Sequence, residues 1–265
     1  MTVSIASNTI VLDNVGDNES NIMNNSKIAW DNALTRATSV TCSSDALSSP
    51  NLYDYMTTTF WAAGVGVQTV DIVLPAAESI NCAAIAAGNW FTASTVIEVY
   101  SDAGITKVGE ISGLRDGQPY IFDFTSVSTS VLQFKFTSAG ALNVGQLLVG
   151  KSLDLPTSAS VGLQLGKFNN NDKVIGQLTE TNAISSSSTV SRARDTVAPF
   201  QFVPIIWVES DWVNFSDSHK GKPIWFSWDN ANKPGDTTFG SWSTDTIRYT
   251  SSFFTTFTLT VKGQV

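Results

Sequence analysis

The chain consists largely of short segments in which apolar and polar residues alternate, and this pattern constrains its fold more than any other feature. Residues 132–136 read Leu-Gln-Phe-Lys-Phe, and near the C-terminus Phe257, Leu259 and Val261 alternate with Thr. Successive side chains of a strand point to opposite faces of a sheet, so each such segment has one apolar face. Turn residues recur every ~8–12 residues, a spacing typical of antiparallel β-sandwiches. We therefore predict an all-β fold without a long amphipathic helix.

The alternation and the bounding turn residues define the predicted strands. They are residues 68–74, 80–87, 95–100, 107–111, 120–124, 131–136, 144–148, 174–178, 189–194, 202–208, 223–228, 247–249 and 253–262. Pro75 is expected to end the first of these strands, because proline cannot donate a ladder hydrogen bond.

Residues 80–102 are predicted to form the centre of the first half of the chain. The run 80–87 is apolar and indicates a buried strand. Gly88 and Asn89 tolerate positive φ, so the chain can reverse there and place Trp90 and Phe91 at the end of a sheet. Two interpretations of this turn stay open. The rings stack on the C–H face of a sugar, or they pack inward or against a neighbouring subunit.

Composition narrows the classes of function. Charged residues make up 14% of the chain, against ~25% in a typical globular domain, and the balance is rich in Ser, Thr and Asn, as in extracellular or virion β proteins. The net charge is −8 and the 15 Lys and Arg residues are not clustered, so we do not expect nucleic acid as a partner. The N-terminus lacks the pattern of a signal peptide, and no apolar run is long enough to predict a membrane span.

Few residues suggest chemistry. His219, the single histidine, is expected to be a solvated loop residue, and we predict that the chain is not an enzyme. A glycosidase needs two facing carboxylates, and the candidates are scattered: Glu98, Glu110, Asp116, Asp123, Glu180, Glu209 and Asp211. Cys42 and Cys82 are interpreted as buried free thiols, with a disulfide as the alternative.

No metal site or other cofactor is predicted, although a structural calcium stays open. The loops 13–19 and 169–172 are rich in Asp and Asn, whose oxygens suit a hard cation. Such residues are also common in turns that bind nothing.

The polar connector after Pro156 divides the chain. We predict a first domain at residues 1–155 and a second, β-rich and sandwich-like domain at 156–265 that contacts a partner or assembly. In the second domain Trp225 and Trp228 lie an odd number of residues apart, so a regular strand would point them to opposite faces. One is expected in the core and the other at an interface.

The order of short motifs between residues 32 and 150 resembles the galactose-binding-like, or discoidin-type, jelly roll. The matching segments are Pro-Asn-Leu-Tyr-Asp at 50–54, Thr-Thr-Phe-Trp at 58–61, Val-Asp-Ile at 70–72, Gly-Asn at 88–89 and Val-Tyr-Ser-Asp-Ala-Gly at 99–104. Trp90 replaces the small or aliphatic residue usual after the Gly-Asn turn. The resemblance implies a sandwich fold. Many members of the family bind carbohydrate, others hold assemblies together, and a structural calcium is common among them.

The second half resembles minor structural proteins of tailed-bacteriophage tails, through the segment Gly-Lys-Pro-Ile-Trp-Phe-Ser-Trp-Asp at 221–229 and the terminal Phe/Thr strand. These resemblances imply a virion component, in the tail tip, baseplate or a fibre adaptor. Its partners would be other tail proteins, in a homo- or hetero-oligomer, and it would contact host-surface glycans. The alternatives are a free carbohydrate-binding module and, less favoured, a glycan-cleaving enzyme. The candidate ligand-binding or interface residues are Asn89, Trp90, Phe91, Trp225 and Trp228.

Overall fold

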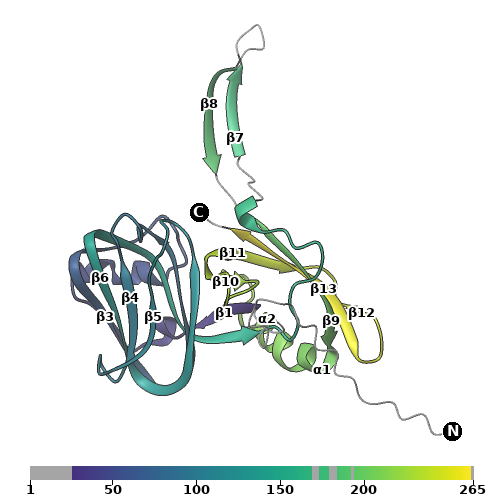
Figure 1. Cartoon of the computed structure of the whole chain (residues 1–265), viewed down its shortest axis with the longest axis horizontal. Helices are drawn as coiled ribbons and strands as arrows, with labels where there is room; N and C mark the ends of the chain where they lie inside the picture. The colour runs from purple at the N-terminus through teal and green to yellow at the C-terminus, as the bar shows by residue number, and fades with distance from the viewer. Residues whose placement is uncertain (1–25, 169–172, 179–183, 192–193, 264–265) are drawn as a thin grey trace, which may run out of the picture.

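The computed structural model describes residues 26–168, 173–178, 184–191 and 194–263 and confirms the all-β prediction. Figure 1 shows two bodies side by side, with the β7–β8 hairpin extending away from both. The strands are β1 (Lys27–Asn32), β2 (Ser39–Cys42), β3 (Trp61–Gly88), β4 (Val96–Ser101), β5 (Thr106–Ile111), β6 (Tyr120–Asp154), β7 (Lys173–Leu178), β8 (Ile184–Ser191), β9 (Thr196–Pro204), β10 (Ile224–Ser227), β11 (Thr237–Thr244), β12 (Arg248–Tyr249) and β13 (Phe254–Gly263). The helical segments are the 3-10 helices η2 (Ala33–Arg36), η3 (Ala46–Leu52), η4 (Gly166–Phe168) and η6 (Pro234–Asp236), the α-helices α1 (Ile205–Trp207) and α2 (Val213–Ser218), and the π-helical segment η5 (Val208–Trp212).

Two long, bent strands build both layers of the first body. Where β3 pairs with β6, residue numbers rise along one strand as they fall along the other. Val73 lies opposite Val131 in one layer, and Ala84 lies opposite both Ile121 and Leu148 in the other. β2 and the β4–β5 hairpin extend the first layer. The largest core cluster, which includes Trp61, Phe134 and Phe136, fills the space between the layers. The first body is thus a β-sandwich.

Pro75 does not end a strand as predicted. β3 continues through it, but its pairing with β6 lapses between Val73 and Glu78. The proline therefore lies where β3 passes from one layer to the other and no ladder bond is required of it.

Strand β1 joins the two bodies into one sheet. It pairs with β6 on one side and with β10 on the other, so that the sheet runs in the order β12-β13-β11-β10-β1-β6-β3-β2. Side chains alternate along β1: Ile28 enters the core of the second body, whereas Ala29 enters a small cluster between the bodies. Leu155, the last residue of the predicted first domain, also packs in the second core. The division at 155/156 stays a prediction.

Both cysteines are buried free thiols, as predicted. Burial raises the pKa of Cys42 to about 12 and raises that of Cys82 well above its usual value. Neither thiol is therefore ionised at neutral pH, and both act as small apolar side chains.

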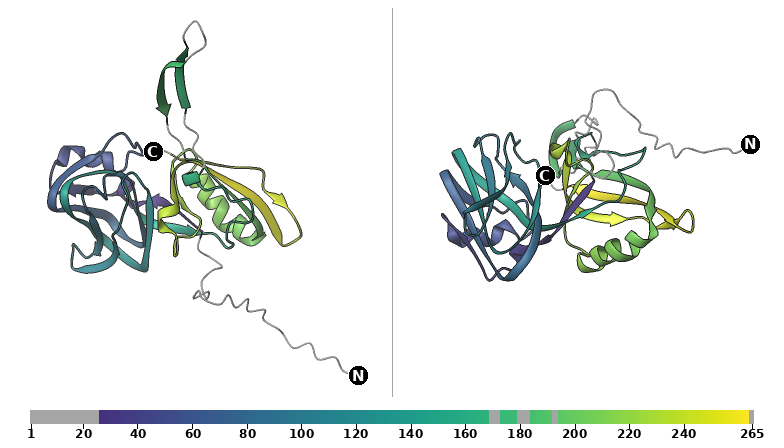
Figure 2. Two further views of the ribbon diagram at one scale, coloured as in Figure 1. Left: turned by 45° about the horizontal axis from the view of Figure 1, so that its top comes forward. Right: turned by 60° about the horizontal axis from the view of Figure 1, so that its bottom comes forward.

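A helical segment covers one face of the sheet in the second body. α1, η5 and α2 follow one another without a break, and Figure 2 shows them lying along the sheet. Val208, Trp212 and Phe215 recur at the spacing of an amphipathic helix and are buried against the sheet. The centroid of the Trp212 ring lies 4.7 Å from that of Phe257 on β13. The cover of this sheet is thus an amphipathic helical segment over 205–218, and the prediction that the chain has no long amphipathic helix was wrong here.

Two local predictions in this region were wrong. The predicted strand 202–208 ends at Pro204, which caps the helix that follows. His219 is not solvated but 3% exposed, because it lies at the C-terminal end of α2 on the buried side of the helix. Its Nε2 lies 2.8 Å from the Pro223 carbonyl oxygen, and its ring stacks on Phe215.

The pKa of His219 makes a pH dependence of stability measurable. Burial lowers this pKa and so does the positive charge of Lys222, while the Pro223 hydrogen bond and Asp31 act in the opposite direction, and the net shift is downward from 6.5. As the pH falls, His219 is therefore protonated in the unfolded chain at a higher pH than in the folded chain. The free energy of unfolding should decrease below about pH 6.5, with a slope of at most ~1.4 kcal/mol per pH unit. Urea unfolding at about pH 7.5 and pH 5.5 measures this loss. His219→Gln, which keeps an N–H donor, should lose less stability over the same interval, and an equal loss in both proteins would contradict the assignment.

Candidate functional site

The turn between β3 and β4 sends its two aromatic side chains in opposite directions. Trp90 is fully buried in the first core, whereas Phe91 is 72% exposed. A Cβ on Gly88 would overlap the indole ring of Trp90, so the close packing of ring on backbone requires glycine there. Trp90 thus packs inward and Phe91 faces solvent, while contact of Phe91 with a sugar stays a prediction.

Two polar side chains fix this turn to its surroundings. Asn89 donates from Nδ2 to a carbonyl of β6 at 2.8 Å, and its Oδ1 accepts from the Asn143 N–H at 2.7 Å. Asp116 accepts from the backbone N–H groups of Phe91 at 2.7 Å and Thr92 at 3.1 Å, and also from the Thr92 hydroxyl. Partial loss of hydration raises the pKa of Asp116, but these hydrogen bonds lower it by more, and the net shift is downward. The carboxylate is therefore charged at neutral pH and holds the Phe91 backbone in place.

Beside Phe91 the surface forms an open groove of about 650 Å³. Its lining residues are Trp90, Phe91, Thr92, Ser94, Thr95, Val96, Ser112, Gly113 and Leu114. None of these described residues carries a charge, and four of them carry hydroxyl groups. The groove is therefore neutral, with one exposed ring and several groups that both donate and accept hydrogen bonds.

Two buried polar atoms of the groove have no hydrogen-bond partner among the described residues. They are Nε1 of Trp90 and Oγ1 of Thr95, and both side chains are almost completely buried. Leaving such an atom unpaired costs ~1–3 kcal/mol, which is why most buried polar atoms have partners. Both atoms lie beneath the groove surface, so the hydroxyls that a ligand in the groove can reach are those of the exposed Thr92, Ser94 and Ser112.

Trp225 and Trp228 both pack within the chain, against different clusters. Trp225 is fully buried between the two bodies and donates from Nε1 to the Ile85 carbonyl at 3.0 Å. Trp228 follows β10 and lies partly buried against the second core. Trp225 thus forms an interface inside one chain. A role of either residue in contact with another molecule stays a prediction.

Most of the carboxylates considered for catalysis have structural partners where the structure describes them. Glu98 lies between Lys107 and Lys135, at 3.2 and 2.8 Å, and Asp123 pairs with Lys27 at 3.0 Å. Glu180 and both Asp- and Asn-rich loops considered for calcium lie outside the described residues. Within the described ranges no group of three or more His, Cys, Asp or Glu side chains could hold a metal, and no helix is long and apolar enough to cross a membrane.

No protein-family model and no curated protein matches the sequence. Solved structures do match part of the chain. A chitosan-binding module from a Paenibacillus sp. IK-5 chitosanase/glucanase is 22% identical over 45% of this chain and 98% of the module, with a TM-score of 0.36. CpGH89CBM32-6 of Clostridium perfringens is 19% identical over 43% of this chain and 92% of its own, with a TM-score of 0.36.

A pectin-binding carbohydrate-binding module is also similar, at 18% identity over 43% of this chain and 91% of its own, with a TM-score of 0.36. Each match covers less than half of this chain. At these TM-scores the similarities carry no argument about a ligand. None of the named structures bears on the expected phage-tail context.

The sequence pointed to the turn but not to the rest of the groove. Thr95 and Ser112 come from the ends of two different strands, and Asp116 lies 25 residues from Phe91 in the chain. Serine, threonine and aspartate in turns are common, and only their spatial convergence distinguishes these.

Gly88→Ala should destabilise the protein, because the added methyl group would overlap the Trp90 ring. Overpacking of this kind costs ~1–3 kcal/mol. Gly140→Ala is the matched control, since a Cβ there would lie 3.5 Å from its nearest neighbour, an ordinary contact. Urea unfolding measures both changes. Equal stability of the two variants would show that the indole does not depend on close approach to Gly88.

Proposed function

We propose that the chain is a non-enzymatic glycan-binding protein and that the groove beside Phe91 holds a neutral sugar. The observation that carries this proposal is the combination of an exposed phenyl ring with three exposed hydroxyl side chains, those of Thr92, Ser94 and Ser112, in one uncharged groove. From the sequence, a carbohydrate-binding module was the alternative to a phage-tail component, and the geometry of the groove favours carbohydrate binding.

The chemistry of the groove matches that of a pyranose ring. A pyranose has a face of C–H groups, which packs on a flat apolar ring, and an edge of hydroxyl groups, which need partners. Phe91 supplies the ring, and its backbone is held by Asp116 through a 2.7 Å hydrogen bond. The exposed hydroxyls of Ser94 and Ser112 can donate to sugar hydroxyls or accept from them.

The groove also favours a neutral ligand over a charged one. Among the described residues that line it there is no Lys, Arg, Asp or Glu. The nearby Asp116 carboxylate, which is exposed on its other side, would repel an acidic sugar. The groove therefore favours an uncharged hexose as its ligand.

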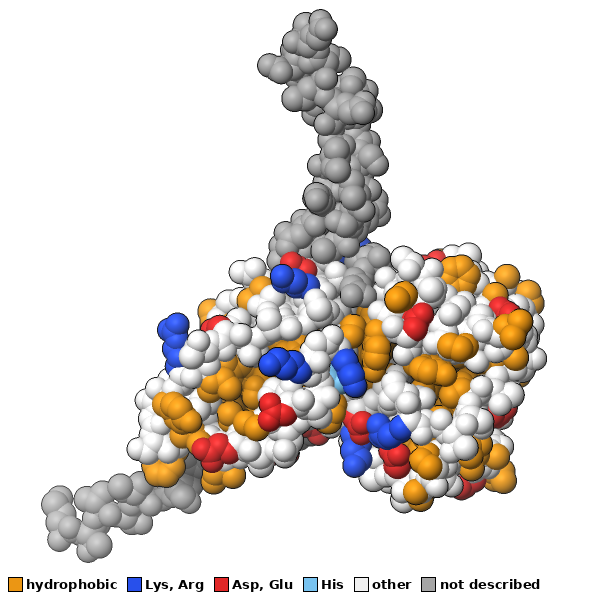
Figure 3. All heavy atoms as spheres, turned by 180° about the vertical axis from the view of Figure 1, so that it is seen from behind, with side chains coloured by type: hydrophobic (Ala, Val, Ile, Leu, Met, Phe, Trp, Pro, Cys, Tyr) orange, Lys and Arg blue, Asp and Glu red, His pale blue; other side chains and the backbone are white. Residues whose placement is uncertain are grey.

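The second candidate function is the one that the sequence suggested, a component of a larger assembly such as a phage tail. One surface supports it. Phe202 is 65% exposed with a φ of 56°, a conformation that phenylalanine rarely adopts. Its ring lies 6.2 Å from that of Phe254, and Phe253 and Ile206 nearby are 75% and 81% exposed. Figure 3 also shows hydrophobic side chains on the surface of the second body. Exposed apolar clusters commonly contact other proteins.

Phe91→Ala should lower the affinity for the glycan roughly tenfold, the effect of losing part of the burial of a phenyl ring. A glycan array identifies the ligand, and titration calorimetry measures the affinity. The denaturation midpoint should not change, because Phe91 is 72% exposed. Ser112→Ala should also weaken binding and leave stability unchanged, because it removes an exposed hydroxyl that lines the groove.

Phe253→Ala is the matched control, since its ring is 75% exposed but lies on the second body. It should bind as the unaltered protein does. Full binding by Phe91→Ala would contradict the site. No glycan binding, together with an oligomeric mass in native mass spectrometry, would overturn the proposal in favour of assembly.

A further inference from the structure

A second pocket lies where the two bodies meet, at the base of the β7–β8 hairpin. Gln118 and Pro119 before β6 form one wall, and Thr237 to Phe239 of β11 form another. Arg194, which precedes β9, and Gly166 of η4 close it on the hairpin side. Its volume is about 40 Å³, against ~10–15 Å³ needed for one water, so it admits a group the size of a carboxylate.

The backbone of Arg194 is held in place by two glycines. A Cβ on Gly166 or on Gly263 would overlap the Arg194 carbonyl oxygen. Both glycines therefore let the chain approach Arg194 from either side, and neither could be replaced without moving it. Backbone packing thus fixes the position of the Arg194 main chain, from which the side chain extends.

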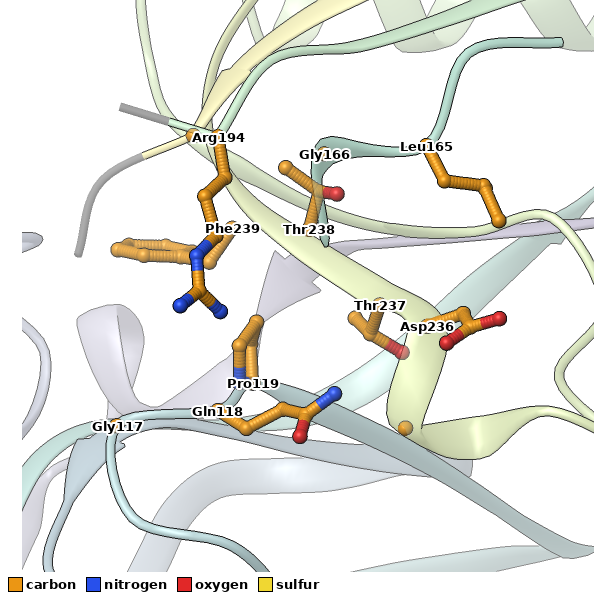
Figure 4. A pocket seen from close by; sticks show the side chains of 12 residues that line it. Gly117, Gln118, Pro119, Leu165, Gly166, Arg194, Asp236, Thr237, Thr238 and Phe239 are labelled. Atoms are coloured by element: carbon orange, nitrogen blue, oxygen red, sulfur yellow. The ribbon is translucent and has the colours of Figure 1, made fainter. Parts of the chain in front are cut away.

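The side chain of Arg194 points into the pocket. Figure 4 shows its guanidinium directed toward the segment of Gln118 and Pro119, while the carboxylate of Asp236 is turned away from it. Arg194 takes part in none of the ion pairs formed among the described residues. The other polar groups of the pocket wall are neutral, and the hydroxyls of Thr237 and Thr238 already bond to Pro234 at 2.9 Å and to Thr196 at 2.6 Å.

We propose that this pocket binds the carboxylate of a small organic acid through Arg194, as a site separate from the groove beside Phe91. A guanidinium presents N–H donors in a planar fork that matches the two oxygens of a carboxylate. The Gln118 amide also lines the pocket and can bond to hydroxyls of the ligand. The ring of Phe239, 1% exposed, forms an apolar wall. The proposal does not depend on glycan binding in the groove.

Titration calorimetry with glucuronate, galacturonate, acetate, glucose and inorganic sulfate tests the proposal. With Phe91→Ala protein, in which the groove lacks its exposed ring, the carboxylates should bind and glucose, which lacks the charge, should not. Tighter binding of the uronates than of acetate would identify an acidic sugar as the source of the carboxylate, and equal binding would identify a free small acid. Both results support the site. Sulfate binding as tight as that of any carboxylate would overturn it.

Arg194→Gln should weaken carboxylate binding at least tenfold. Arg194→Lys should weaken it less, because lysine keeps the positive charge although it lacks the planar guanidinium. Arg248→Gln is the matched control, an exposed arginine on β12. Phe91→Ala should leave carboxylate binding unchanged, which separates this site from the groove. Urea midpoints confirm that each variant is folded. No carboxylate binding by the full chain, or unchanged binding by Arg194→Gln, would overturn the proposal.

Discussion

The packing of Trp225 and Phe239 against the outer face of β3 is the interaction on which the arrangement of the two bodies depends. Cys82, Ala84 and Ala86 point outward from the sandwich and are small enough to admit both rings. The rings lie 4.3 Å apart, and the Trp225 indole donates to the carbonyl of Ile85 at 3.0 Å. Because both faces of this strand are covered, its sequence is continuously apolar where a strand with one wet face would alternate.

This contact and the shared strand β1 place both candidate sites on one framework. Lys27 of β1 pairs with Asp123 and Asp154 of β6, both at 3.0 Å, beside the ladder that joins the bodies. The pocket at Arg194 takes one wall from the sandwich and another from β11, so its shape is set by how the bodies meet. The groove beside Phe91 belongs to the sandwich alone. A change at the junction should therefore affect the pocket more than the groove.

Local sequence patterns predicted the strands well, because alternation reports the two faces of a sheet directly. Residues 80–87, 95–100 and 253–262 lie almost wholly within β3, β4 and β13. The helical cover was missed because the apolar run 202–208 fits a strand, although β9 ends at Pro204 and Val208 belongs to the helical segment. The pairing of β1 with β10 joins residues about two hundred positions apart, and no local pattern reports it.

The candidate sites were predictable only in part, for the same reason. Glycine followed by Asn, Trp and Phe marked a turn that displays a ring, but not which ring. The Trp90 ring packs closely on the backbone of Gly88, and the Asp116 carboxylate holds the backbone of Phe91. These two contacts fix the direction of each ring. Arg194 carried no signal in the sequence, since its position is set by Gly166 and Gly263 from distant parts of the chain.

Native-state hydrogen exchange of Trp225→Ala tests most directly whether the two bodies form one unit. Removal of a buried tryptophan costs ~3–5 kcal/mol. If Trp225 stabilises both bodies, the free energy of opening should fall by a similar amount for amides of β3 and amides of β10. Loss of protection in β10 while the amides of β3 keep theirs would contradict this, and would show that the sandwich is stable without the second body.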